Sequence, residues 1–115
     1  HPMDMKMVLL PVVSYIRLYS FREGLSETGS KERARELFEK QVFSPELYEE
    51  LMQAYDFVTQ LRIRSQAEKI ARNEVPGNTT DCKNLNQFEL LILKKHLQNI
   101  AGLQTLLNSA FNNPE

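Results

Sequence analysis

Apolar residues recur with the period of an α-helix along most of this chain, and no stretch shows the alternation of apolar and polar residues that a strand shows. The pattern predicts four helices, over residues 11–23, 30–42, 45–73 and 86–111. Because short connections join them, we expect an all-α fold, a four-helix antiparallel bundle with two long helices.

Residues with known preferences for helix ends stand at the predicted boundaries. They are Pro11 and Gly24 for the first helix, Ser30 for the second, Ser44 before Pro45 for the third, and Asn86 with Glu89 for the fourth. The loop 75–81, which contains Pro76 and Gly77, separates the two long helices.

Residues 1–6 form an irregular beginning in this prediction, as if a longer polypeptide had been cut upstream of the first helix. We therefore predict a single helical domain, 1–115, that is the C-terminal fragment of a longer protein. The apolar run 7–13 is too short to span a bilayer, and Tyr15 and Arg17 stand where a signal peptide would have small residues. Apolar residues surround this first helix almost completely, so we expect it to be buried between the others.

Composition and charge exclude several classes of function. With 115 residues and 42% hydrophobic residues, the chain suits one small globular core. The net charge of −1 gives no general attraction to nucleic acid or to an anionic membrane, and we expect neither as a partner. Cys82 is the single cysteine, which excludes an internal disulfide and a Cys/His zinc site. A reducing, cytoplasmic location fits this composition best.

The third helix changes character along its inward arc, and we look for function at that change. Its first part is apolar and its last part is polar. The members of the arc are Leu47, Leu51, Ala54, Tyr55, Val58 and Leu61, then Arg62, Ser65, Gln66, Lys69 and Arg72. Burying an unpaired guanidinium or amide costs on the order of several kcal/mol, so these groups need partners. An anionic ligand would serve, and so would solvent if the helix extends beyond its bundle.

Three arginines differ in their expected roles. Arg62 lies one turn from Gln66, where the two could grip a carboxylate or a phosphate. Arg64 points to the opposite, polar side and is interpreted as a solvated surface charge. Arg17 stands in the apolar first helix, so it either pairs with an acid from a neighbour or joins Arg62 at one cavity. The aromatic residues Tyr48, Tyr55 and Phe57 are typical of packing rather than of a platform for bases.

Residues for catalysis are few. The chain has no glycine-rich phosphate loop, no zinc-protease motif and no nucleophile elbow. His96 is the only internal histidine and falls within the apolar arc of the last helix, which is typical of a structural histidine. Phosphotransfer bundles need a phosphoacceptor histidine that faces solvent, so we disfavour that function.

Several short motifs, in order and at matching spacing, resemble one protein family. They are Leu61-Arg62-Ile63-Arg64-Ser65-Gln66, Pro76-Gly77-Asn78 before Leu85, Leu93-Lys94, and Leu103-Gln104 before Phe111, together with Arg17 and with Arg33 after Thr28-Gly29-Ser30. The chain from Val8 to Phe111 resembles the helical nucleotidyltransferase substrate-binding domain that forms the C-terminal part of domain of unknown function 294. The family usually has a histidine where Ser65 stands, and this difference weakens any role of that position in proton transfer, although a serine can still donate a hydrogen bond.

The resemblance implies a larger bacterial enzyme with a role in signal transduction. In this family, a nucleotidyltransferase domain similar to that of the PII uridylyltransferases precedes the helical domain, often with cystathionine-β-synthase-type modules and a cyclic-nucleotide-like sensor. Magnesium and the nucleoside triphosphate would belong to that upstream domain, and we expect no cofactor and no metal in the present chain.

We therefore predict a noncatalytic, accessory domain that binds the acceptor or the nucleotide phosphates beside the catalytic domain. The candidate binding residues are Arg62, Gln66, Arg17, Ser65, Lys69 and Asn78. One alternative is an interaction bundle, such as a homodimer, in which Arg62 belongs to an internal network of salt bridges. Another, less favoured alternative is a phosphotransfer bundle that uses His96. An acid against Arg62 would favour the interaction bundle, and an open pocket lined by Arg62, Gln66 and Arg17 would favour substrate binding.

Overall fold

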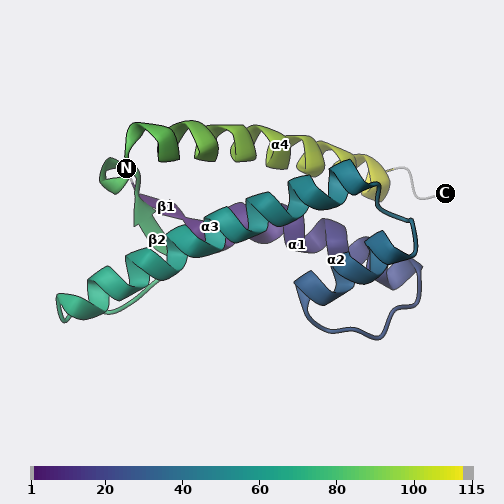
Figure 1. Ribbon diagram of the computed structural model, residues 1–115, viewed down its shortest axis with the longest axis horizontal. Helices are drawn as coiled ribbons and strands as arrows, with labels where there is room; N and C mark the ends of the chain where they lie inside the picture. Colours follow the sequence, from purple (N-terminus) through teal and green to yellow (C-terminus); the bar gives the residue numbers. More distant parts are fainter. Residues whose placement is uncertain (1, 113–115) are drawn as a thin grey trace.

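The computed structural model describes residues 2–112 and is mostly helical, as predicted (Figure 1). The helices are α1 (Met5–Arg22), α2 (Ser30–Glu39), α3 (Pro45–Ala71) and α4 (Gln87–Asn112), with a short 3₁₀ turn, η1 (Cys82–Asn84). Two short strands, β1 (Pro2–Asp4) and β2 (Thr79–Asp81), complete the fold. None of the helices that the structure describes is long and apolar enough to cross a membrane.

The arrangement of the helices differs from the predicted four-helix antiparallel bundle, which is not confirmed. Three of the helices are long, and α1 and α4 lie side by side and run in the same direction, whereas α3 runs against both (Figure 1). The shorter α2 packs on α1 and α3 near one end of the molecule. The C-terminal part of α3 extends beyond the other helices at the opposite end (Figure 1).

The absence of strands was a wrong prediction. β1 and β2 form an antiparallel pair in which Met3 lies opposite Thr80. Directly after β1, the amide of Met5 donates to the carbonyl oxygen of Asn78 at 2.7 Å. Strands of three residues are too short to show an alternating pattern, and such a pair is stable only when it packs on other elements. Residues 2–6 are therefore ordered rather than irregular, and His1 lies outside the described residues.

The first helix begins six residues earlier than predicted. The side chain of Asp4 caps it by accepting hydrogen bonds from the amides of Lys6 and Met7, at 3.0 and 3.2 Å. Pro11 therefore lies inside α1 rather than at its first position. An interior proline costs a helix about 3 kcal/mol, and the burial of apolar side chains on both sides of Pro11 offsets this cost. Those side chains are Met5, Leu9, Val12 and Ile16.

Of the other end signals, Ser30 is wrong and the rest are confirmed. Gly29 is the N-cap of α2, Ser30 is the first residue of this helix, and no side chain caps it with a hydrogen bond. The hydroxyl of Ser44 accepts the amide of Leu47 at 3.1 Å. Asn86 and Glu89 exchange side-chain to backbone hydrogen bonds of 2.8 and 3.0 Å, which is the capping box expected from their spacing. Gly24 ends α1 in the left-handed conformation, with φ of 66°, as a residue without Cβ can do at little cost.

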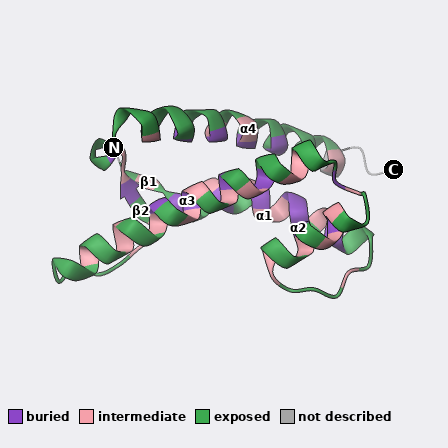
Figure 2. Ribbon diagram, viewed as in Figure 1, coloured by how far each residue is buried: buried purple, intermediate pink, exposed green. Residues whose placement is uncertain are grey.

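The apolar core consists of two clusters along the contacts between α1, α3 and α4 (Figure 2). The larger cluster joins α2 and the first half of α3 to the last half of α4, and it includes Leu37, Phe43 and Leu51. The smaller cluster lies at the end with the strands, where Val58 and Leu61 complete the apolar arc of α3. The expected burial of α1 on all sides is wrong, because Met7, Leu10 and Phe21 are exposed.

Candidate functional site

The polar end of the arc on α3 lies against the segment that leads into β2 and against Thr79, the first residue of that strand. Gln66 Nε2 donates to the carbonyl oxygen of Gly77 at 3.0 Å, and Ser65 Oγ donates to that of Thr79 at 2.9 Å. Lys69 Nζ contacts both the carbonyl oxygen and the hydroxyl of Thr79, at 3.1 and 2.9 Å. Three of the six predicted binding residues therefore hold the chain's own backbone in place on this flank of α3.

Arg62 begins this polar flank, directly after the last buried leucine of the arc. Its side chain is half-buried, and its Nε has no solvent exposure and no hydrogen-bond partner among the described residues. A guanidinium keeps its charge in proteins, and a buried N–H without a partner costs about 1–3 kcal/mol. Arg62 therefore has unused capacity to donate hydrogen bonds.

The charges along this part of α3 are compensated unequally. Arg64 pairs with Glu89 at 2.7 Å, and Arg72 lies 4.0 Å from Glu68 and 3.8 Å from a second carboxylate, that of Glu74. Among the described residues, no carboxylate pairs with Arg62 or Lys69. These two positive charges lie on the same flank, two helical turns apart, which is about 10 Å along the axis. The flank is therefore locally positive although the whole chain is slightly acidic.

The remaining predicted binding residues lie apart from Arg62 or act through the backbone. Arg17 is exposed on α1 and pairs with no acid among the described residues. It is 12 residues, or about 18 Å along the helix, from Met5, which packs in the same cluster as Leu61. The structure therefore does not bring Arg17 to Arg62. Asn78 is half-buried, and its carbonyl oxygen accepts the amide of Met5.

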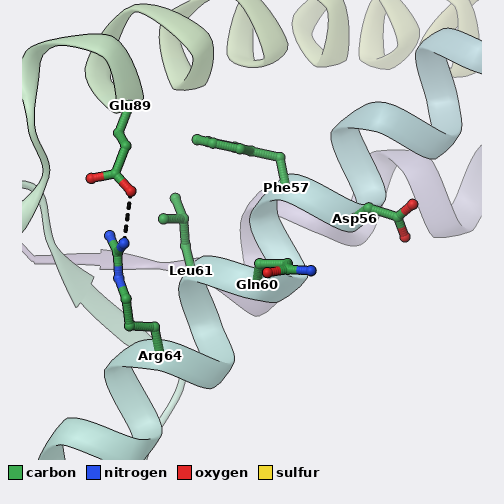
Figure 3. A pocket seen from close by; sticks show the side chains of 6 residues that line it. All are labelled: Asp56, Phe57, Gln60, Leu61, Arg64 and Glu89. Atoms are coloured by element: carbon green, nitrogen blue, oxygen red, sulfur yellow. Dashed lines mark hydrogen bonds and ion pairs between the residues drawn. The ribbon is translucent and has the colours of Figure 1, made fainter.

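Arg64 was expected to be a solvated surface charge, but it forms an ion pair with a second helix. Its guanidinium reaches across from α3 to Glu89 in the first turn of α4 (Figure 3). The hydrogen bond from Arg64 holds the pKa of Glu89 below its usual range, and the amide of Asn86 acts in the same direction. The spacing of Asn86 and Glu89 predicts the capping box. Spacing along one helix cannot show, however, that Arg64 of α3 also pairs with Glu89.

A cleft lies between α3 and the first turn of α4, beside this ion pair. We call it the α3–α4 cleft, and it has a volume of about 360 Å³. Its lining consists of Asp56, Phe57, Gln60, Leu61, Arg64 and Glu89. Phe57 and Leu61 point into the same space as the ion pair, whereas the carboxylate of Asp56 lies on the far side of Phe57 (Figure 3). The cleft could not be predicted from the sequence, because its residues come from two segments about 30 positions apart.

His96 is buried on the inner side of α4, as its place in the apolar arc predicted. Its ring lies 5.4 Å from that of Phe57, centroid to centroid. Burial lowers the pKa of His96 because it disfavours the imidazolium, and the charge of Lys95 lowers it further, whereas Glu50 opposes the shift. Its Nδ1 has no hydrogen-bond partner among the described residues, although a buried structural histidine usually has one. A histidine that is only 7% exposed is poorly placed to accept a phosphoryl group from a partner.

The described residues offer no cluster that suits a metal ion. No group of three or more His, Cys, Asp or Glu side chains within residues 2–110 is arranged to hold one. The arrangement on α3 is instead one of hydrogen-bond donors, which suits the binding of an anion.

The comparison with protein families identifies the chain's family. The model of the family described as "Putative nucleotidyltransferase substrate binding domain" matches residues 1–111 of the chain, which is nearly its whole length. No curated protein and no solved structure matches the chain. The match contains the segment from Arg62 to Thr79, whose side chains and carbonyl oxygens form the polar flank of α3. The chain belongs to the family of putative nucleotidyltransferase substrate-binding domains.

Proposed function

We propose that this domain holds the phosphate-bearing part of a nucleotidyltransferase substrate, either the nucleotide or its acceptor, on the polar flank of α3. The proposal rests on the guanidinium of Arg62, which lacks a hydrogen-bond acceptor at Nε and a neutralising charge among the described residues. Its guanidinium is half-buried, its Nε has no partner among the described residues, and no described carboxylate neutralises it. A phosphate oxygen would supply both the missing acceptor and the missing negative charge.

The neighbours of Arg62 support this assignment. Lys69 adds a second charge without a carboxylate partner among the described residues, and its two hydrogen bonds to Thr79 fix the position of its ammonium group. Ser65 and Gln66 hold the backbone at Gly77 and Thr79 against α3, so they build one wall of the flank. In this proposal, Ser65 and Gln66 define the shape of the site. Arg62 is the principal contact to the anion, and the charge of Lys69 adds electrostatic attraction.

The catalytic chemistry, in this proposal, belongs to a separate nucleotidyltransferase domain similar to that of the PII uridylyltransferases. That domain would supply the carboxylates for magnesium and would bind the triphosphate for transfer. The family description names a substrate-binding role, and a substrate-binding domain requires a catalytic domain beside it. An acid against Arg62 would have favoured the alternative of an interaction bundle, and no described residue supplies one. The open pocket lined by Arg62, Gln66 and Arg17 is not formed either, because Arg17 lies apart from Arg62, so the proposal rests on Arg62 and its neighbours on α3.

Calorimetric titration of the chain with pyrophosphate and with UTP tests the proposal. Arg62→Ala should weaken binding about ten-fold or more, because a hydrogen bond between charged groups contributes about 1.5–3 kcal/mol. Arg35→Ala is the matched control, since it removes the same charge from an exposed position on α2 whose only described partner is Glu39, at 3.9 Å. Equal affinity of the wild type and Arg62→Ala would exclude Arg62 as the anion contact.

A further inference from the structure

The α3–α4 cleft lies on the flank of α3 opposite to Arg62, and the proposed contact with phosphate leaves it unused. Its volume of about 360 Å³ falls within the range of small-molecule sites, about 300–1,000 Å³. Phe57 and Leu61 give it an apolar floor, and the ion pair between Arg64 and Glu89 borders one end (Figure 3). This combination of an apolar surface with a few polar groups is typical of a ligand site rather than of a gap between helices.

The charges around the cleft are balanced. Arg64 neutralises Glu89 at 2.7 Å, and Lys31 of α2 neutralises Asp56 at 2.8 Å. A charged ligand would have to compete with one of these pairs, whereas a neutral ligand would not. The cleft therefore favours an uncharged molecule, in contrast to the positive flank on the other side of α3.

An aromatic ring provides the largest apolar surface of the cleft. Phe57 is half-buried, and its packing against the ring of His96 at 5.4 Å restricts its orientation. A planar ring stacked on a fixed aromatic side chain gains both dispersion energy and apolar burial. The contact with His96 agrees with the packing role that the sequence predicts for Phe57, and the same side chain also lines the cleft.

The polar groups of the cleft can recognise carbonyl oxygens. Both carboxylate oxygens of Glu89 are occupied, one by Arg64 and the other by the amide of Asn86. The guanidinium of Arg64 uses one of its five N–H groups in this pair, which leaves further donors on a residue that lines the cleft. The exposed amide of Gln60 adds one acceptor and two donors.

We propose that the α3–α4 cleft binds the planar ring of a carbonyl-bearing nucleobase such as uracil, stacked on Phe57 and hydrogen-bonded by Arg64. The inference rests on the proposed function, because a nucleotidyltransferase substrate includes a nucleotide and therefore a neutral, planar base. It adds a second site, which recognises the base, to the site that recognises phosphate.

Titration of the ¹⁵N-labelled chain with uridine, which carries no phosphate, tests this site alone. We expect the amide signals of residues 57–64 and of Glu89 to shift. Phe57→Leu should weaken uridine binding about five-fold or more, because it keeps an apolar side chain but removes the stacking surface. The matched control is Phe88→Leu, the same change at a ring on α4 that is 78% exposed and does not line the cleft, and it should leave the affinity unchanged.

Two further variants keep the test decisive. Arg64→Lys retains the charge opposite Glu89 and removes the fork of donors, so it should weaken uridine binding even if Phe57→Leu fails to fold. Arg62→Ala should weaken the binding of pyrophosphate and leave that of uridine unchanged. If uridine shifts no signal from the cleft while pyrophosphate still binds, the base site is excluded and the proposed function stands. Uridine binding that neither Phe57→Leu nor Arg64→Lys weakens would also exclude it.

Discussion

The two halves of α3 show how one continuous helix serves two purposes. In the first half, Leu51, Ala54 and Val58 are almost completely buried in the core. In the second half, the same flank presents Arg62, Ser65, Gln66 and Lys69. The last three of these side chains donate hydrogen bonds to Gly77 and Thr79, before and at the start of β2, rather than packing on another helix. Apolar burial contributes about 25 cal/mol per Å², whereas a single hydrogen bond contributes about 1 kcal/mol. We infer that the first half determines stability and that the second half is free to contribute to binding.

The largest expected effect concerns the first half. Leu51→Ala should lower the free energy of unfolding by about 2–5 kcal/mol, because Leu51 is 1% exposed and its truncation leaves a cavity. Urea denaturation measures this change. The comparison residue is Ile63, an apolar side chain of the second half that is 59% exposed, and Ile63→Ala should change the free energy by less than about 0.5 kcal/mol. Similar losses for both variants would show that the core extends further along α3 than the structure indicates.

A smaller effect is expected for the contact between the second half and its loop. Gln66→Ala removes the hydrogen bond to the carbonyl oxygen of Gly77 and should cost about 0.5–1.5 kcal/mol in urea denaturation. Gln53→Ala is the matched control in the first half, because Gln53 donates only to the exposed Glu49 on the same helix. We expect that variant to stay within about 0.5 kcal/mol of the wild type. If Gln66→Ala leaves the free energy of unfolding unchanged, this hydrogen bond does not hold the loop in place.

The smallest effect is a dependence of stability on pH that arises from His96, beside the middle of α3. Because burial lowers the pKa of His96 in the folded state, the unfolded chain binds this proton more readily. The resulting stability is present above the ordinary histidine pKa of about 6.5 and is lost as the pH falls through the folded value. His96→Gln should therefore flatten the fall in the free energy of unfolding below pH 7. An unchanged slope would show that His96 does not titrate differently in the two states.

Features encoded by neighbouring residues could be predicted from the sequence, and features that join distant segments could not. The caps at Ser44 and Asn86 depend on contacts within three residues, so their spacing alone identified them. The strands depend on the pairing of residues 2–4 with residues 79–81, and neither segment has a pattern of its own. Pro11 was misplaced because Asp4 provides an earlier cap and because tertiary packing offsets the cost of an interior proline.

The candidate site shows the same limit. The helical period placed Arg62, Gln66 and Lys69 on one flank, and the structure confirms that Gln66 and Lys69 share a surface against the loop. The helical period could not show that carbonyl oxygens between residues 77 and 79 would accept hydrogen bonds from several of these side chains. Nor could it show that Arg64 would meet Glu89, 25 residues away, and thereby border a cleft.

Hydrogen exchange along α3, measured with and without UTP, tests the division of this helix most directly. If the second half contacts the substrate, UTP should slow exchange in residues 62–71 and 77–81, which form the polar flank and its loop. Residues 45–55 of the first half should exchange at the same rates in both samples, because their protection comes from the core. Unchanged exchange in the second half at saturating UTP, or slowing confined to residues 45–55, would contradict the account.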